Sequence, residues 1–269
     1  MPKQISSVQN PLVKQLFNLI EKSRERRKSG LFVIEGGREI GLALEGGYML
    51  KSVLFCPDLF SEEKLTTLEA KLEDSTELIE INLDVFQKLA YRSSTEGILA
   101  LAESREHPVR HLKLTSPNPL ILVAEAPEKP GNIGALLRTA DAAAADAVII
   151  ANPKTDLYNP NIVRSSVGGV FTNQIALGTT KEIIAFLKEN KITVFCAALQ
   201  ASKPYTQCDF SLAAAIVLGT EATGLSSEWL ENSSENIVIP MHGVIDSMNV
   251  SVAAGILLFE AKRQRTLQS

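Results

Sequence analysis

Cysteine is scarce in this chain of 269 residues, which contains three, and none of them belongs to a Cys-x-x-Cys pair. The odd number and the spacing predict neither a disulfide framework nor a zinc site, so we expect Cys56, Cys196 and Cys208 to be buried or incidental thiols. No apolar run reaches transmembrane length, and the first residues lack the apolar segment of a signal peptide. We therefore expect a cytoplasmic protein without membrane contacts.

Several common enzyme signatures are absent as well. The turn that contains Gly131 and Gly134 reads Gly-x-x-Gly, so it does not match the Gly-x-Gly-x-x-Gly fingerprint of nicotinamide enzymes. The chain has no P-loop, no serine nucleophile elbow and no His-Glu-x-x-His pattern, which argues against the commonest hydrolases. His107 and His111 could share a helical face, but a zinc site needs three or four protein ligands and no third is evident. We expect no metal site.

The charge that is present is unevenly distributed. The formal net charge is −4, yet the stretch from Lys3 to Arg38 contains eight basic and three acidic residues. A local basic patch can bind phosphates even on an acidic protein, although a solvated helix face is an alternative interpretation. The predicted RNA contacts are Lys22, Arg24, Arg26, Arg27, Lys28 and Arg38.

The first 103 residues alternate between helical and extended patterns. We expect an amphipathic helix from Asn10 to Arg27, then a buried strand at 31–34 and a tight turn at Gly36-Gly37. Strands at 52–55, 78–81 and 98–102, with helices near 39–45, 62–72 and 85–90, complete a small α/β domain, and this alternation favours a mainly parallel sheet. Residues 104–119 mix charges and prolines without an apolar period, which is typical of a linker.

Residues 120–269 predict a second α/β domain. Apolar strands at 120–124, 148–150, 174–177, 193–199, 213–218 and 236–239 alternate with helices at 133–145, 159–168, 182–188 and from 250 past 263. Ligands of open α/β sheets bind beyond the carboxyl ends of the strands, so we expect the chemistry in the loops after the last two strands. These loops contain permissive turns and helix-capping residues, namely Gly219, Gly224, Pro240, Asp246, Ser247 and Asn249.

Three stretches of this domain resemble the motifs of the SpoU/TrmH branch of the SPOUT RNA methyltransferases. They are Gly131-Asn132-Ile133-Gly134-x-x-x-Arg138-Thr139-Ala140, then Leu218-Gly219-x-Glu221-x-x-Gly224-Leu225, then Ile239-Pro240-Met241 with Ser247-Met248-Asn249-Val250-Ser251-Val252-Ala253. Their order and spacing form a specific signal over roughly residues 120–263. A weaker resemblance links the N-terminal part to the substrate-binding domain of many SpoU proteins, through Asn10-Pro11, Phe32-Val33-Ile34-Glu35-Gly36 and Arg38.

The resemblance implies a fold, a reaction and an assembly. A small α/β RNA-binding domain similar to a ribosomal protein (1–103) would precede a trefoil-knotted SPOUT domain with a mostly parallel sheet (120–269). The reaction would transfer a methyl group from S-adenosylmethionine to a ribose 2′-hydroxyl of RNA, with rRNA preferred over tRNA. The enzyme would be a homodimer joined through the C-terminal domain. The implied cofactor-binding residues are Leu199, Gly219, Ile239, Met241, Met248 and Asn249.

The resemblance also implies catalytic roles for Asn132, Arg138, Glu221 and Ser251. Because a guanidinium stays charged in proteins, we expect Arg138 to bind a phosphate and stabilise the developing alkoxide rather than act as a general base. Each residue also has a structural interpretation: Asn132 as a helix cap, Arg138 paired with Asp141, Glu221 bracing its loop, and Ser251 bonded to its own helix backbone.

Three alternative functions remain at this stage. A tRNA 2′-O-methyltransferase or a base methyltransferase would keep the cofactor site, whereas a non-catalytic RNA-binding assembly factor would keep only the fold. The joint presence of the four polar motif residues argues against the assembly factor.

Overall fold

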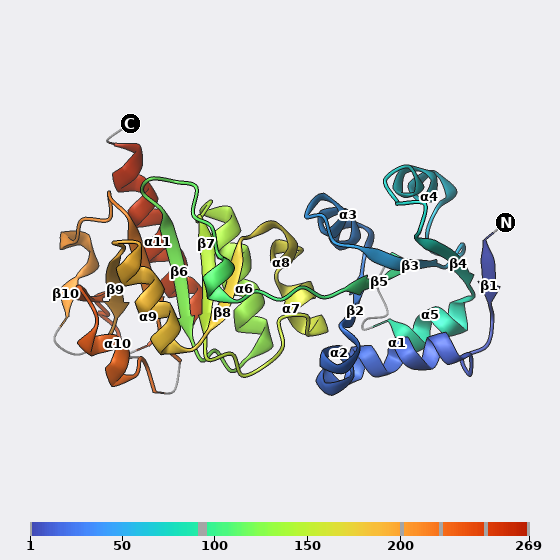
Figure 1. Cartoon of the computed structure of the whole chain (residues 1–269), viewed down its shortest axis with the longest axis horizontal. Helices are drawn as coiled ribbons and strands as arrows, with labels where there is room; N and C mark the ends of the chain where they lie inside the picture. Colours follow the sequence, from blue (N-terminus) through green and yellow to red (C-terminus); the bar gives the residue numbers. More distant parts are fainter. Residues whose placement is uncertain (1, 91–95, 200–201, 221–222, 245–246, 268–269) are drawn as a thin grey trace. The chain divides into compact units, whose positions relative to one another are not determined.

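The computed structural model describes residues 2–90, 96–199, 202–220, 223–244 and 247–267. The chain forms two compact units (Figure 1). Unit 1 consists of Met1–Arg105 and Thr155–Thr172, and unit 2 consists of Glu106–Lys154 and Asn173–Ser269. Within the described residues, none of the helices has both the length and the apolarity that a membrane crossing requires.

Unit 1 is built on a sheet of mixed direction. Its strand order is β1-β4-β3-β5-β2, in which β1, β4 and β3 are parallel while β5 runs antiparallel to both β3 and β2. The expected mainly parallel sheet holds for strand direction, because only β5 runs against the others. The sequence pattern does not predict that β5 lies between β2 and β3, so that two strands joined by a helix are not neighbours. The strands are β1 Lys3–Ile5, β2 Leu31–Glu35, β3 Leu50–Phe55, β4 Glu77–Ile81 and β5 Ile98–Glu103.

The helices of unit 1 come from both of its chain segments. The segment that follows Lys154 contributes α7 and α8, and Figure 1 shows α7 beside β2, which it contacts. The helices are α1 Pro11–Glu21, α2 Ser23–Ser29, α3 Gly37–Glu45, α4 Glu62–Glu69, α5 Leu83–Leu89, α7 Pro160–Ser165 and α8 Gly169–Thr172.

The single helix expected from Asn10 to Arg27 is two helices in the structure. The Asn10 side chain caps α1 by accepting a hydrogen bond from the Leu12 N–H, but Lys22 adopts an extended conformation that ends this helix. The carbonyls of the last turn of a helix need new donors, and Arg26 supplies them by donating to the carbonyls of Leu19 (2.5 Å) and Ile20 (3.0 Å). This side-chain capping favours a break that the apolar period does not reveal.

Unit 2 has a seven-stranded sheet of order β10-β12-β9-β11-β6-β7-β8, and all of its strand pairs are parallel. The expected mostly parallel sheet is confirmed for this unit. The strands are β6 Leu120–Glu125, β7 Ala147–Ala151, β8 Ile175–Gly178, β9 Thr193–Ala197, β10 Lys203–Pro204, β11 Ala214–Leu218 and β12 Glu235–Val238. The helices are η1 Val109–His111, α6 Pro130–Ala142, α9 Thr180–Glu189, η2 Tyr205–Gln207, α10 Ser227–Glu231 and α11 Val250–Thr266.

Helices cover both faces of this sheet (Figure 1). On one face α9, α10 and η1 bury Val109, Ile183 and Trp229 against the strands. On the other face α6 packs against α11, which buries apolar side chains such as Leu257. Val109 belongs to the segment expected as a linker, so part of that segment is packed in the core of unit 2. The carboxyl ends of the parallel strands are thereby held at one edge.

Candidate active site

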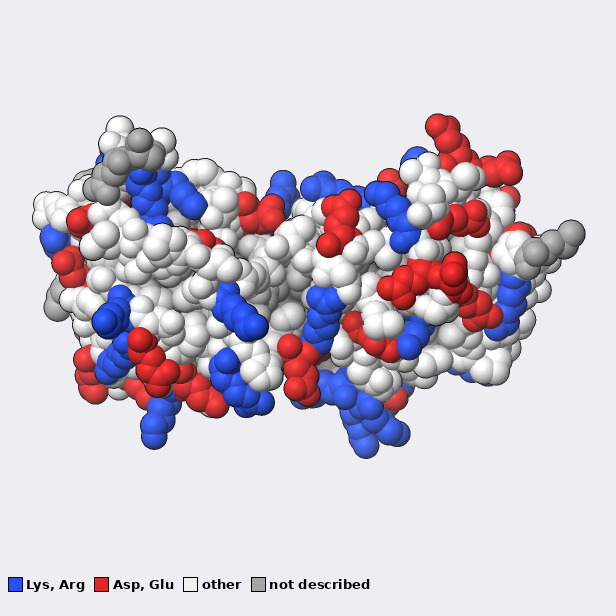
Figure 2. Space-filling model, turned by 45° about the horizontal axis from the view of Figure 1, so that its top comes forward, with Lys and Arg blue, Asp and Glu red and all other residues white. Residues whose placement is uncertain are grey.

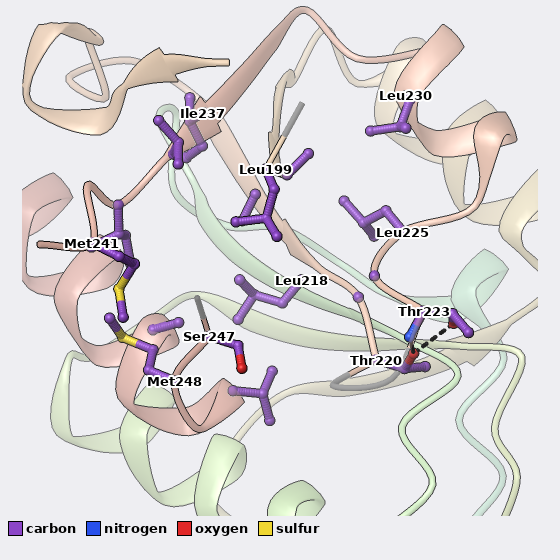
Figure 3. Close-up of a pocket in the computed structure, with 18 residues that line it drawn as sticks. Leu199, Leu218, Thr220, Thr223, Leu225, Leu230, Ile237, Met241, Ser247 and Met248 are labelled. Carbon is purple, nitrogen blue, oxygen red and sulfur yellow. Dashed lines mark hydrogen bonds between the residues drawn. The ribbon is translucent and has the colours of Figure 1, made fainter. Parts of the chain in front are cut away.

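A pocket of about 510 Å³ opens beyond the carboxyl ends of β9, β11 and β12 in unit 2 (Figure 3). Ligand pockets for small molecules occupy roughly 300–1,000 Å³, so the volume suits a nucleoside-sized cofactor. Its walls come from the loops after these strands and from the start of α11. The lining residues are Ala197, Ala198, Leu199, Leu218, Gly219, Thr220, Thr223, Gly224, Leu225, Leu230, Ile237, Val238, Ile239, Met241, Ser247, Met248, Val250 and Ala253.

The lining is mainly aliphatic and thioether. Met241 and Met248 lie on one side of the pocket, and Leu225 and Leu230 lie on the other (Figure 3). Such a wall can hold the flat face of a purine, while the backbone groups of the surrounding loops provide the polar contacts.

Gly219 has a position that no other residue could occupy without moving the loop. A Cβ placed there would lie 2.2 Å from the carbonyl carbon of Gly224 and 2.5 Å from the backbone nitrogen of Leu225. Thr220 and Gly224 exchange backbone hydrogen bonds of 3.1 Å, and Gly224 has a φ of +67°. The backbone is therefore folded tightly on itself at the wall of the pocket.

The structure brings most of the predicted cofactor residues to this one pocket. Leu199, Gly219, Ile239, Met241 and Met248 all line it. Asn249 is not among the lining residues and instead caps α11, since its side-chain oxygen accepts a hydrogen bond from the Ser251 N–H at 2.9 Å. Thr220, Ser247 and Val250 also line the pocket; they lie within the quoted motifs but were not predicted to bind the cofactor. Leu230 lines the pocket as well, and the sequence carries no signal for it.

Three of the predicted polar residues are joined in a chain of hydrogen bonds. The Asn249 amide donates to the Asn132 side-chain oxygen (3.3 Å), and the Ser251 hydroxyl donates to the Asn249 side-chain oxygen (2.6 Å). Asn132 is not the cap of its helix, because that position belongs to Lys129. The hydroxyl of Ser251 likewise bonds a side chain rather than its own helix backbone. The first and third motifs are therefore linked at this point.

Arg138 is exposed on α6 and has no hydrogen bond or ion pair with another residue in the described part of the chain, Asp141 included. It lies six residues beyond Asn132, which corresponds to about 9 Å along a helix. Because Arg138 is exposed and has no partner among the described residues, its guanidinium is open to a ligand. Glu221 lies outside the described residues.

The cysteines are buried free thiols, as expected. Burial raises the pKa of Cys196 to about 11, which keeps this thiol protonated and unsuited to nucleophilic chemistry. Among the described side chains, no cluster of three or more His, Cys, Asp or Glu residues could hold a metal ion.

The predicted RNA-binding side chains of unit 1 fall into two groups. Lys22, Arg24, Arg27, Lys28 and Arg38 are exposed, and Figure 2 shows basic side chains gathered over α2. Arg26 differs, because it is 4% exposed and its Nε and Nη2 atoms donate to Asp156 at 2.8 Å each. Its position is that of a structural residue rather than of a contact that RNA can reach.

Comparison with known proteins decides the family. The model of the SpoU rRNA methylase family matches residues 119–259, which is more than half of the chain. The chain belongs to the SpoU rRNA methylase family. Residues 10–100 also match the MRM3-like substrate binding domain. The family predicted from the sequence motifs is therefore confirmed.

Relatives of this SpoU family member match over nearly the whole chain. It is 30% identical to the 23S rRNA (guanosine(2553)-2'-O)-methyltransferase RlmP of Bacillus subtilis, over 97% of this chain and 99% of the relative. A crystal structure described as an RNA 2′-O ribose methyltransferase is 38% identical, with a TM-score of 0.85 and coverage of 98% and 99%. The SpoU methyltransferase AviRb of Streptomyces viridochromogenes, crystallised with AdoMet, is 26% identical, with a TM-score of 0.88 and coverage of 96% and 99%.

Proposed function

We propose that this SpoU family member transfers the methyl group of S-adenosylmethionine to a ribose 2′-hydroxyl of ribosomal RNA. The observation that carries the proposal is the pocket at the carboxyl ends of β9, β11 and β12, which is lined by residues of the second and third motifs. A relative that is 30% identical is named a 23S rRNA 2′-O-methyltransferase, and another, of similar fold, was crystallised with AdoMet.

The residues of the pocket fit this cofactor. Leu199, Ile239, Met241 and Met248 supply an apolar wall for the adenine, and the close approach of backbone at Gly219 lets the loop fold into the pocket wall, where its main chain can contact the ribose and the methionine chain. The bound cofactor supplies an electrophilic methyl group on a sulfonium. The pocket walls orient it, and orientation of this kind can contribute several kcal/mol, about 7 or more in favourable cases, to lowering the barrier.

The catalytic proposal assigns different tasks to the polar residues. Arg138 binds the phosphate beside the target ribose and stabilises the oxygen as it loses its proton, since a permanent positive charge suits both tasks. Asn132, Asn249 and Ser251 hold one another in place, and the Ser251 oxygen can accept a hydrogen bond from the substrate because its own proton is directed at Asn249. Glu221 is proposed from the motif alone as the group that accepts a proton or hydrogen bond.

Unit 1 is proposed to bind the RNA through the exposed basic side chains of the α2 region, with Arg26 excluded. Acidic side chains gather over α4 instead (Figure 2), which makes that part of unit 1 unfavourable for phosphates. The match to a substrate-binding domain over residues 10–100 supports this assignment. Ribosomal RNA is preferred over tRNA because the relative RlmP acts on 23S rRNA.

We also propose, from the resemblance to the SPOUT family, that unit 2 contains a trefoil knot. A further proposal is that two chains form a homodimer through unit 2. The helix α11 leaves Val252 and Phe259 about half exposed, at 53% and 52%, on an apolar stripe that also includes Ile256. Burial of such side chains in an interface is favourable. Light scattering at micromolar concentration should therefore give the mass of two chains, and a double change of Val252 and Phe259 to Ser should give one.

The test of the reaction is transfer of labelled methyl from S-adenosylmethionine to ribosomal RNA, followed by nucleoside analysis. We expect 2′-O-methylnucleosides from the wild type. Arg138→Ala should lower the rate about 10²–10³-fold, the range seen when a charge-stabilising donor is removed. Arg110→Ala, at an exposed arginine of η1, is the matched control and should leave the rate unchanged.

The other outcomes identify the competing functions. Methylated bases would show that the reaction class is wrong, and transfer to tRNA but not to rRNA would favour a tRNA enzyme. RNA binding without any transfer to naked RNA or ribosomal subunits would favour the assembly factor.

A further inference from the structure

A buried carboxylate is hydrogen-bonded to Ser226, the residue that follows Leu225 in the wall of the proposed cofactor pocket. Glu125, the last residue of β6, is 6% exposed. A buried carboxylate is costly unless hydrogen bonds compensate for its lost hydration. Glu125 accepts three: from the Ser226 N–H (2.8 Å), from the Ser226 hydroxyl (2.7 Å) and from the Thr180 hydroxyl (3.2 Å).

These hydrogen bonds anchor one end of the loop that forms a wall of the pocket. We call the residues Gly219, Thr220 and Thr223–Ser226 the glycine loop. Its inner part is held by the Thr220–Gly224 backbone pair and by the hydrogen bond from the Thr223 N–H to the Thr220 hydroxyl (3.0 Å). These bonds join Thr220 to Thr223 and Gly224, so the placement of these residues in the pocket wall depends on how the loop is held at its two ends. β11 fixes the first end, and Glu125 fixes the second through Ser226.

A second pair of residues orients the carboxylate itself. The Thr180 hydroxyl donates to Glu125 and accepts a hydrogen bond from the Asn152 amide (2.9 Å), while the Asn152 side-chain oxygen accepts from the Thr180 N–H (3.3 Å). Thr180 is 3% exposed. The network therefore joins the end of β6, the residue after β7, the start of α9 and the glycine loop. Because Glu125 and Thr180 are both buried, water competes little for these hydrogen bonds, which helps to hold the anchor in place.

We propose that Glu125 is a positioning residue that fixes the glycine loop through Ser226 and thereby sets the affinity of the pocket for S-adenosylmethionine. The inference rests on the proposed function, because it requires the cofactor to bind in this pocket. Glu125 does not touch the reacting atoms. Its removal should therefore weaken cofactor binding and leave the chemical step of the loaded enzyme largely intact.

The experiment measures binding of S-adenosylhomocysteine by calorimetry, the KM for S-adenosylmethionine, kcat at saturating cofactor, and the melting temperature. Glu125→Gln keeps the size of the side chain and removes the charge. We expect its Kd and KM to rise about tenfold or more, since bonds to a charged group are lost, with kcat within about twofold of the wild type. Ser226→Ala removes one bond of the same anchor and should shift Kd in the same direction, which keeps the test valid if Glu125→Gln does not fold.

The control is the carboxylate of Asp146, which precedes β7 and contacts the opposite end of β6. Asp146 accepts a hydrogen bond from the Leu120 N–H at 2.7 Å, so Asp146→Asn perturbs β6 without touching the glycine loop. It should lower the melting temperature and leave Kd unchanged. A Glu125→Gln variant that loses melting temperature but keeps the wild-type Kd would overturn the inference alone. Absence of binding by the wild type would overturn the proposed function and the inference together.

Discussion

Two arginines of this protein have the same chemistry and opposite surroundings. Arg26 in unit 1 is buried and donates twice to Asp156 and twice to main-chain carbonyls, so its guanidinium is largely shielded from solvent. Arg138 in unit 2 is exposed and has no partner among the described residues. The difference shows that residue type and local charge do not distinguish an arginine that is already bound within the fold from one that is open to a ligand. What separates them is whether the folded chain already satisfies the donors.

The surroundings of Arg26 also show how unit 1 is assembled. Asp156 and Tyr158 come from the segment that follows β7, and the Tyr158 ring stacks on Phe32 with centroids 4.2 Å apart. The Tyr158 hydroxyl forms hydrogen bonds with Tyr48 (3.1 Å) and with the Arg105 N–H (3.0 Å). The basic N-terminal segment is therefore completed by residues more than 100 positions later in the chain.

The largest effect on stability is expected from Arg26→Ala. It would leave the Asp156 carboxylate partly buried, at 12% exposure, without its counter-ion, and would free two carbonyls at the end of α1. Breaking a buried pair in this way costs about 3–5 kcal/mol. Urea unfolding followed by circular dichroism measures the loss, with Arg27→Ala as the exposed neighbour, which should change stability by less than about 0.5 kcal/mol.

A paired replacement sharpens the result. Arg26→Met combined with Asp156→Leu removes both charges together, and should recover much of the stability lost in Arg26→Ala because no unpaired carboxylate remains. Equal losses from Arg26→Ala and Arg27→Ala would contradict the structural role, and would return Arg26 to the RNA-binding set.

The next largest effect is expected on cofactor binding, from changes of the two glycines in the wall of the pocket. Gly219→Ala would place a Cβ against backbone atoms that cannot rotate away, so the glycine loop must shift and binding of S-adenosylhomocysteine should weaken by well over tenfold. Gly224→Ala meets no atom within 4 Å and carries only the strain of its positive φ, about 1–2 kcal/mol in stability. Calorimetric titration of both variants gives the comparison. Similar affinities in the two variants would show that the close approach at Gly219 has no bearing on the pocket.

The sequence motifs predicted more of the pocket lining than of the contacts around Arg26, and the reason is physical. Residues such as Gly219, Met241 and Met248 lie in short local patterns whose order the motifs record, and strand ends meet at one edge of a parallel sheet. The partner of Arg26 lies 130 residues away, and no local period reveals such a contact. The position of β5 between β2 and β3 is equally non-local. Short elements such as α10 were missed because five residues do not establish a period.

The smallest expected effect tests whether a hydrogen-bonded charged side chain contributes to stability when it is exposed rather than buried. Glu182 is exposed in the capping box of α9, where it accepts hydrogen bonds from the Thr179 N–H (2.8 Å) and hydroxyl (2.9 Å). These bonds lower the pKa of Glu182 from its ordinary value. A depressed pKa contributes stability that is present above the unfolded-state pKa and is lost as the pH falls through the folded-state pKa. Glu182→Gln keeps a side chain able to accept these bonds but removes the titration.

The melting temperatures of wild type and Glu182→Gln should therefore differ most near neutral pH and converge as the pH falls below the folded-state pKa of Glu182. A difference for Glu182→Gln that stays constant across the acid range would mean that its charge is irrelevant to the cap. The hydrogen bonds of the exposed Glu182 would then stabilise the helix through their geometry alone. The large loss of stability expected for Arg26→Ala would be due to the burial of Arg26.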